Sequence, residues 1–168
     1  TPWDGPGPVT NTRRQLGPID SDRPAKSPHR AFVAGVTGTI ERLLELGVQR
    51  VLVIGPVPEV YRTAPECINR ADKYGMSREE ACFAPTDMVK ARARFATEWL
   101  AEAVPLNSKV RYINPQDSFC DAMYCRVSDG DDVLYFDHNH LSQAGTEWMI
   151  SRFKTDFDWA FNVTAPES

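Results

Sequence analysis

The chain has 168 residues, about the size of one domain, and its 42% hydrophobic and 25% charged residues are ordinary for a globular protein. The formal net charge of −4, with acidic and basic residues interspersed, argues against a dedicated nucleic-acid or anionic-membrane surface, because either would need a basic patch. No apolar run approaches the ~20 residues of a transmembrane helix, and no signal peptide begins at Thr1, so we expect any targeting segment to lie upstream of this sequence.

The N-terminal part of the chain predicts an extended segment, then a helix and a strand. Residues 1–27 are rich in proline and glycine and predict an extended surface segment. A helix should begin at Pro28, with Ser27 as its N-cap, and end at Gly47. The apolar run Val51–Ile54 is typical of a strand buried on both faces of a parallel sheet. Helix and buried strand are half of a βαβ unit, and the strand that should precede them is absent from the sequence.

The middle of the chain predicts a rigid loop, a cysteine-bearing excursion and a long helix. Gly55-Pro56-Val57-Pro58 forces an extended loop at the carboxyl edge of the sheet. Pro65–Pro85 reads as an insertion, in which Ser77 begins a capping box and therefore a short helix. We expect Thr86–Asp87 to cap a long amphipathic helix that runs to about Ala103.

The C-terminal part predicts two more strands, separated by polar loops, and a final helix. Val110–Ile113 alternates with polar neighbours and predicts a strand. The loop Ser128–Asp132 carries three aspartates around a glycine turn; because it lacks the ligand spacing of an EF-hand, we favour a solvated turn over a calcium site. Val133–Phe136 predicts a short strand, and Leu141 to about Phe161 predicts one helix with Ser142 as a possible cap.

Four cysteines, Cys67, Cys82, Cys120 and Cys125, form an even set. Four allow three pairings, and we favour Cys67 with Cys82 and Cys120 with Cys125, because each pair encloses a short loop. A zinc site is a competing interpretation, although no Cys-x-x-Cys occurs and the three histidines are scattered; free buried thiols are another. Disulfides would place the domain in an oxidising compartment such as a bacterial periplasm.

The turn after the last predicted strand carries the candidate catalytic residues. Asp137 and His140 lie three residues apart there, so the carboxylate can hold the imidazole by its Nδ1–H and leave Nε2 free as a general base for a hydroxyl nucleophile. His138 could compete for the base role, but its side chain should diverge from that of His140. Asn139 is more simply a turn former than an oxyanion donor. The alternative is that Asp137 and His140 merely cap and pack the start of the last helix.

These residues carry a family resemblance. Asp-x-x-His followed by Leu-Ser and a small-residue helix, at residues 137–145, resembles the last block of SGNH (GDSL-like) hydrolases. In more detail the chain resembles the SGNH domain fused to membrane acyltransferases of the acyltransferase-3 family, which O-acetylate bacterial surface glycans. The strand and Gly-Pro-Val-Pro loop at Val51–Pro58 fit this domain, where the loop helps to wall the active site. Both cysteine segments fit as well, and the similarity runs from about Phe32 to Ile150.

The chain departs from this family at the nucleophile. The family's serine lies in a Gly-Asp-Ser block after the first strand, and this sequence contains no Gly-Asp-Ser. The nearest strings, Asp20-Ser21-Asp22 and Ser128-Asp129-Gly130, follow no apolar strand, and no Gly-x-Asn block is evident. We therefore expect residues 28–168 to be the C-terminal portion of one SGNH-like domain, and this chain alone to have little or no activity.

The resemblance implies an α/β fold with a three-layer, flavodoxin-like parallel sheet, of which this chain would supply about three strands and three main helices. It implies part of an O-acyltransferase that acetylates a bacterial cell-surface or secreted polysaccharide through a Ser-His-Asp triad, without a metal or a cofactor. Such a domain would lie in the periplasm, tethered to the inner membrane through an upstream transmembrane acyltransferase domain. Two alternatives remain: an SGNH carbohydrate esterase that deacetylates, and a non-catalytic glycan-binding module.

Overall fold

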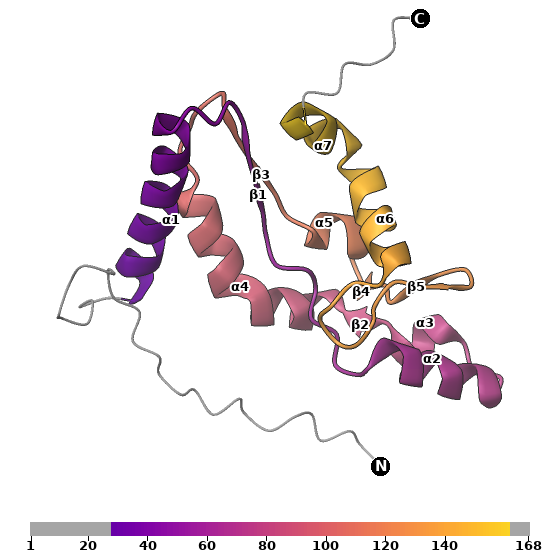
Figure 1. The fold of residues 1–168 in the computed structure, drawn as a ribbon. Helices are drawn as coiled ribbons and strands as arrows, with labels where there is room; N and C mark the ends of the chain where they lie inside the picture. Colours follow the sequence, from indigo (N-terminus) through magenta and orange to yellow (C-terminus); the bar gives the residue numbers. More distant parts are fainter. Residues whose placement is uncertain (1–27, 162–168) are drawn as a thin grey trace, which may run out of the picture.

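The computed structural model describes residues 28–161; the segment predicted for residues 1–27, with its Ser27 cap, and residues 162–168 lie outside the described residues. Within that range the chain is an α/β protein with a small parallel sheet and helices on both sides of it (Figure 1). The helices are α1 Pro28–Glu45, α2 Ala64–Lys73, α3 Arg78–Cys82, α4 Thr86–Ala103, α5 Gln116–Phe119, α6 Gln143–Arg152 and α7 Lys154–Phe161. The strands are β1 Val51–Ile54, β2 Ala84–Pro85, β3 Val110–Ile113, β4 Tyr124–Cys125, β5 Ser128–Asp129 and β6 Asp132–Val133.

Strands β1 and β3 form the parallel sheet, in register from Val51 opposite Val110 to Ile54 opposite Ile113. Among the described residues β1 pairs with no other strand, so its second edge is open. The prediction that β1 is buried on both faces is therefore wrong: Ile54 is 43% exposed, and the other three residues are half-buried. Helices α1 and α4 lie on one side of the two strands in Figure 1 and α7 on the other. The full three-layer sheet stays a prediction.

Helix α1 has the predicted bounds. Pro28 occupies its first position, where the missing amide hydrogen costs no hydrogen bond, and the chain leaves the helix through Gly47. Gly47 has φ +92°, a conformation that residues with a Cβ rarely adopt. The Thr37 hydroxyl donates to the Ala103 carbonyl at 2.7 Å, which fixes α1 to the end of α4.

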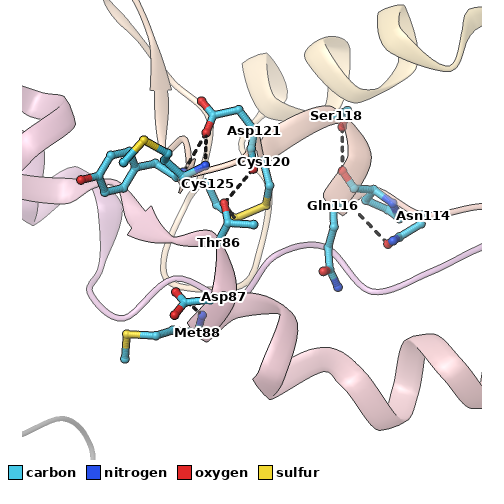
Figure 2. The surroundings of a disulfide bond; sticks show 12 residues. Thr86, Asp87, Met88, Asn114, Gln116, Ser118, Cys120, Asp121 and Cys125 are labelled. Carbon is cyan, nitrogen blue, oxygen red and sulfur yellow. Dashed lines mark hydrogen bonds between the residues drawn. A yellow bond between two sulfur atoms is a disulfide. The ribbon is translucent and has the colours of Figure 1, made fainter.

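Helix α4 confirms the predicted long helix, but its predicted cap is wrong. Pro85 is the N-cap residue, and no side chain caps the helix. Thr86 is the first helical residue, and its hydroxyl donates to the Asp121 carbonyl at 3.0 Å (Figure 2). The Asp87 carboxylate accepts from the adjacent amide of Met88, at 2.8 Å. The Thr86 side chain thus binds the loop at Asp121 and does not cap α4.

Both predicted cysteine pairs are confirmed. Cys67–Cys82 joins α2 to α3, and Cys120–Cys125 closes the loop between α5 and β4 (Figure 2). All four cysteines are therefore bonded, which excludes the zinc and free-thiol interpretations for them. The predicted short helix is α3, where the Ser77 hydroxyl accepts from the Glu80 amide at 3.4 Å.

The strand predicted at Val133–Phe136 is wrong in its bounds and in its partner. Strand β6 is Asp132–Val133, and it pairs antiparallel with β5 across a turn at Gly130, which has φ +54°. Leu134 and Tyr135 are each 1% exposed and enter the core instead of the parallel sheet. The described residues thus supply two parallel strands, not the expected three.

The predicted final helix is two helices. The chain leaves α6 at Phe153, begins α7 at Lys154, and changes direction between them (Figure 1). Trp148 of α6 and Phe157 of α7 both pack against the core, so the break keeps aromatic residues of both helices on the protein. In α6, Met149 is buried, whereas its neighbour Ile150 is exposed.

The buried core lies beyond the carboxyl ends of β1 and β3, among α2, α5, α6 and the start of α4. Its members come from segments far apart in the chain and are mostly small or aliphatic: Val60, Ala64, Ile68, Ala84, Val89, Phe119, Cys125, Val127, Leu134, Tyr135 and Met149. None of the helices within residues 28–161 has the length and hydropathy required to cross a bilayer. The core includes Leu134 and Tyr135, which lead into the turn at residues 136–140, and Leu141, which follows that turn, packs against it.

Candidate active site

Asp137 and His140 form a hydrogen-bonded pair in the turn between β6 and α6. The His140 Nδ1 lies 2.7 Å from the Asp137 Oδ2. The His140 side chain is 73% exposed, and among the described residues its ring has no other hydrogen-bond partner. With Nδ1–H donated to the carboxylate, Nε2 is left as the ring's proton acceptor. The pair thus has the geometry expected of the orienting acid and general base of a hydrolase triad.

The turn holds the two side chains in this geometry through its own backbone. The Asp137 Oδ1 accepts the amides of Asn139 and His140, each at 2.8 Å. The Phe136 amide donates to the His140 carbonyl at 2.8 Å, which closes the turn on itself. Asn139 contributes its backbone amide here, in keeping with its interpretation as a turn former. The orientation of the imidazole is therefore set within a segment of five residues.

These hydrogen bonds set the charge state of Asp137. The amide of Asn139, the ring of His140 and the amide of His140 all donate to the carboxylate, and together they hold the pKa of Asp137 well below its usual range. The carboxylate is therefore ionised at neutral pH. An ionised partner on Nδ1 favours the tautomer that keeps Nε2 unprotonated, and it stabilises the imidazolium that forms when Nε2 takes a proton.

Capping and packing of α6 do not explain the pair. Ser142 is the N-cap of α6: its hydroxyl oxygen accepts the Gly145 amide at 3.0 Å and donates its own proton to the Val133 carbonyl at 2.6 Å. Asp137 caps only the turn that precedes the helix, and His140 is exposed instead of packed. The alternative in which both residues serve the helix therefore has no contact to support it.

Gly145 explains how close α6 comes to the segment that leads into the turn. A Cβ on this glycine would lie 1.9 Å from the Leu134 carbonyl oxygen, far inside any contact that real side chains make. The Ser142 amide also donates to that same carbonyl, at 3.0 Å. Residue 145 must therefore be glycine for α6 to pack this closely against the backbone at Leu134.

The segment that follows the Gly-Pro-Val-Pro loop is hydrogen-bonded to this turn. Gly55 lies against Tyr112, where an added Cβ would be 2.7 Å from the hydroxyl, and Pro58 is fully buried. Two residues later the Val60 amide donates to the His138 carbonyl at 2.8 Å, and the Ala64 amide donates to the Asp137 carbonyl at 3.2 Å. The loop that follows β1 and the turn that follows β6 therefore form one connected wall.

The tertiary structure adds a charged cluster to this wall that the sequence did not reveal. Glu59 accepts two hydrogen bonds from Arg92 of α4, each at 2.6 Å. The His138 Nε2 lies 4.0 Å from the Glu59 carboxylate, so the ring of His138 turns to this cluster while His140 pairs with Asp137. Glu59 and Arg92 are 33 residues apart, and neither lies in a recognisable pattern. Only the position of Glu59 directly after the proline loop could have drawn attention to it.

A nucleophile is not supplied by the described part of the chain. Within residues 28–161 no serine or threonine hydroxyl is hydrogen-bonded to His140, and the nearest one in sequence, Ser142, is used to cap α6. Nor do three or more His, Cys, Asp or Glu side chains in that range gather as metal ligands. The described site is thus an imidazole hydrogen-bonded to a carboxylate.

A family model described as "SGNH domain (fused to AT3 domains)" matches residues 4–155. The chain belongs to this family. No curated protein and no solved structure matches the chain significantly. The match extends beyond both ends of the range from Phe32 to Ile150 over which the resemblance was expected. An SGNH domain of this family is a hydrolase-like module associated with an acyltransferase-3 domain, which supports esterase or acyltransferase chemistry in general terms.

Proposed function

We propose that this SGNH domain is part of an O-acyltransferase that transfers an acyl group, in the simplest case acetyl, to a hydroxyl of a bacterial cell-surface or secreted polysaccharide. The observation that supports this most directly is the pair of His140 and Asp137, joined at 2.7 Å through Nδ1. An imidazole held in this way by an ionised carboxylate is poised to accept a proton from a hydroxyl group at Nε2.

The proposed chemistry has two steps with one base. In the first, Nε2 of His140 takes the proton of a serine hydroxyl as the serine oxygen attacks the acyl carbonyl of the donor; the imidazolium then protonates the leaving group. In the second, Nε2 takes the proton of a sugar hydroxyl as the sugar oxygen attacks the acyl-serine ester, and the serine leaves with that proton. Asp137 stays ionised throughout and stabilises the imidazolium in both steps.

We propose that the serine comes from a Gly-Asp-Ser block that precedes this sequence, on a strand that would extend the sheet toward a three-layer, flavodoxin-like arrangement. The open edge of β1 supports this proposal, because a parallel strand with an unpaired edge can accept another strand. The two disulfides support a periplasmic location, and the family's fusion to acyltransferase-3 domains supports an upstream membrane domain as tether. Reading the coding sequence upstream of Thr1 tests this part directly.

The experiment that tests the function uses the full-length protein in its native host. His140→Gln and Asp137→Asn should each remove acyl groups from the surface polysaccharide, measured by NMR of the purified glycan, and Asp137→Asn should slow transfer by a factor on the order of 10⁴. His138→Gln is the matched control, because that ring faces Glu59 and should leave acylation intact. Normal acylation in the His140→Gln strain would contradict the proposal.

The same experiment separates the two alternatives. In an esterase the acyl-serine is attacked by water instead of a sugar hydroxyl, so loss of His140 would raise the acyl content of the glycan. In a non-catalytic glycan-binding module the His140→Gln protein would behave as wild type in acyl content. The direction of the change in acyl content therefore identifies the reaction.

A further inference from the structure

A small pocket is lined in part by the residues that follow Val60, which is hydrogen-bonded to the turn that carries Asp137 and His140 (together, the dyad). It has a volume of about 200 Å³ and is formed by the segment that follows the proline loop, the end of α3 and the first turn of α4. Tyr61 and Arg62 line it on one side, and Phe83 and Met88 on the other. Cys82 also lines it, so the Cys67–Cys82 disulfide is part of its frame.

Residues 59–61 connect the pocket to the turn that carries Asp137 and His140, and hydrogen bonds fix their position. Val60 donates its amide to the His138 carbonyl at 2.8 Å, and Tyr61 is the next residue along the chain. On the other side of Val60, the two hydrogen bonds from Arg92 fix Glu59 to α4, the helix that carries Met88. Because consecutive Cα atoms are only ~3.8 Å apart, the pocket begins within one or two residues of the wall at the dyad.

The lining combines apolar rings with hydrogen-bond donors. Tyr61 and Phe83 are half-buried, and Met88 is 47% exposed, so the pocket presents apolar surface to solvent. The Tyr61 hydroxyl is protonated at neutral pH, and burial raises its pKa further. The exposed Arg62 carries the five donors of a guanidinium, and none of the contacts among residues 28–161 gives them an acceptor.

The ligand that fits this lining has an apolar face and outward hydroxyl oxygens. We propose that the pocket is a subsite for one pyranose ring of the glycan acceptor; this rests on the proposed transfer to a polysaccharide. The C–H face of the ring packs on the apolar side chains, and Arg62 donates hydrogen bonds to its hydroxyl oxygens. An acyl chain fits less well, because its one carbonyl oxygen offers the guanidinium fewer acceptors than the several hydroxyl oxygens of a sugar. Tyr61 and Arg62 are then specificity residues for the acceptor, on the segment whose Val60 and Ala64 amides bond the turn that carries His140.

Binding can be measured without turnover. We would titrate the ¹⁵N-labelled chain with the methyl pyranosides of glucose, galactose and mannose and follow amide shifts by NMR. At least one of the three should shift amides of residues 59–62 and 83–88 in the oxidised protein. Arg62→Gln should weaken that binding at least about fivefold, the effect expected for losing a charged hydrogen-bond donor. Arg70→Gln is the matched control: it is an exposed arginine on α2, away from the pocket lining, and should bind as wild type.

The outcomes separate this proposal from the function on which it rests. His140→Gln should keep the pyranoside shifts while it removes acylation in the full-length protein. No shift with any of the three sugars, shifts confined to other segments, or equal binding by Arg62→Gln would overturn the subsite while the transferase assignment stands. Displacement of the bound sugar by methyl hexanoate, an uncharged acyl ester, would also overturn it, since the pocket would then take the acyl chain. Binding that survives together with normal acylation in His140→Gln would reject the reaction and keep the subsite.

Discussion

The close contact between Gly145 and Leu134 predicts the effect of a substitution on stability, which can be measured without a substrate. Gly145→Ala adds one methyl group in the first turn of α6, and this Cβ would lie 1.9 Å from the Leu134 carbonyl oxygen. Real Cβ atoms keep at least 3.0 Å from other heavy atoms, so either the helix or the segment before the dyad must move by more than 1 Å. The obstacle is backbone, which cannot rotate away as the end of a side chain can.

The cost can be bounded from general experience with overpacked sites. Forcing one methyl group into a filled position costs about 1–3 kcal/mol, and more where backbone must shift. The Ser142 amide donates to the same Leu134 carbonyl, and that hydrogen bond, at 3.0 Å, would be strained by the movement. We therefore expect Gly145→Ala to lower the free energy of unfolding by about 3 kcal/mol, which is about 6–12 °C in melting temperature for a chain of this size.

The chain provides a matched control for this measurement. Gly38 is also helical, in α1, and nothing lies within 4 Å of a Cβ built on it. Gly38→Ala should stabilise by about 0.5–1 kcal/mol, because alanine loses less conformational freedom on folding. Urea denaturation followed by circular dichroism, with both disulfides oxidised, gives the two midpoints. A Gly145→Ala midpoint equal to or above that of wild type would refute the close packing of Gly145 against the Leu134 carbonyl.

Three further predictions concern the turn and the disulfides. Ser142→Ala removes the N-cap of α6 and should cost about 1 kcal/mol in urea denaturation; an unchanged midpoint would show that the cap contributes nothing. Because the pKa of Asp137 is lower in the folded state, its contribution to stability is present above the unfolded pKa of about 3.9 and is lost as the pH falls through the folded value. The difference in unfolding free energy between wild type and Asp137→Asn should therefore shrink below about pH 4, and a difference that is constant with pH would contradict the hydrogen bonds at the carboxylate. Replacing Cys67 and Cys82 by alanine opens a loop with a sequence separation of 15, against 5 for Cys120 and Cys125, so the chain-entropy model predicts losses of about 3 and about 2 kcal/mol. The reverse order of melting temperatures for the two double variants would contradict that account.

The proposed function and the subsite depend on different atoms of one wall. The reaction needs Nε2 of His140 and the carboxylate of Asp137, which the turn orients by itself. Choice of acceptor would depend on Tyr61 and Arg62, which the proline loop and the Glu59–Arg92 pair hold in place. Substitutions in the second set should therefore change which glycan is acylated before they change the rate of the acyl-transfer chemistry.

The sequence by itself determined those features that are made by residues close together in the chain. The Asp137–His140 pair is one, because a carboxylate that accepts amides two and three residues ahead folds locally around its own turn. Helix α1, with proline at its start and glycine at its end, is another. The sequence left three cysteine pairings open, and the one favoured for its short loops is the one that the structure has. In the turn and in the helix the interacting groups are brought together by local backbone geometry, so the spacing of residue types is sufficient.

Only the tertiary structure decided features made by residues far apart. An apolar run such as Leu134–Tyr135 is typical of a strand and of a core segment alike. It became core because α6 and α2 supply apolar contacts, while within residues 28–161 the parallel sheet consists of β1 and β3. Thr86 reads as a helix cap, yet its hydroxyl bonds a carbonyl 35 residues away. The pairing of Glu59 with Arg92 and the pocket at Tyr61 depend on how the loop after β1 lies against α4. Sequence spacing carries no information on such long-range contacts, because the packing of the whole chain sets them.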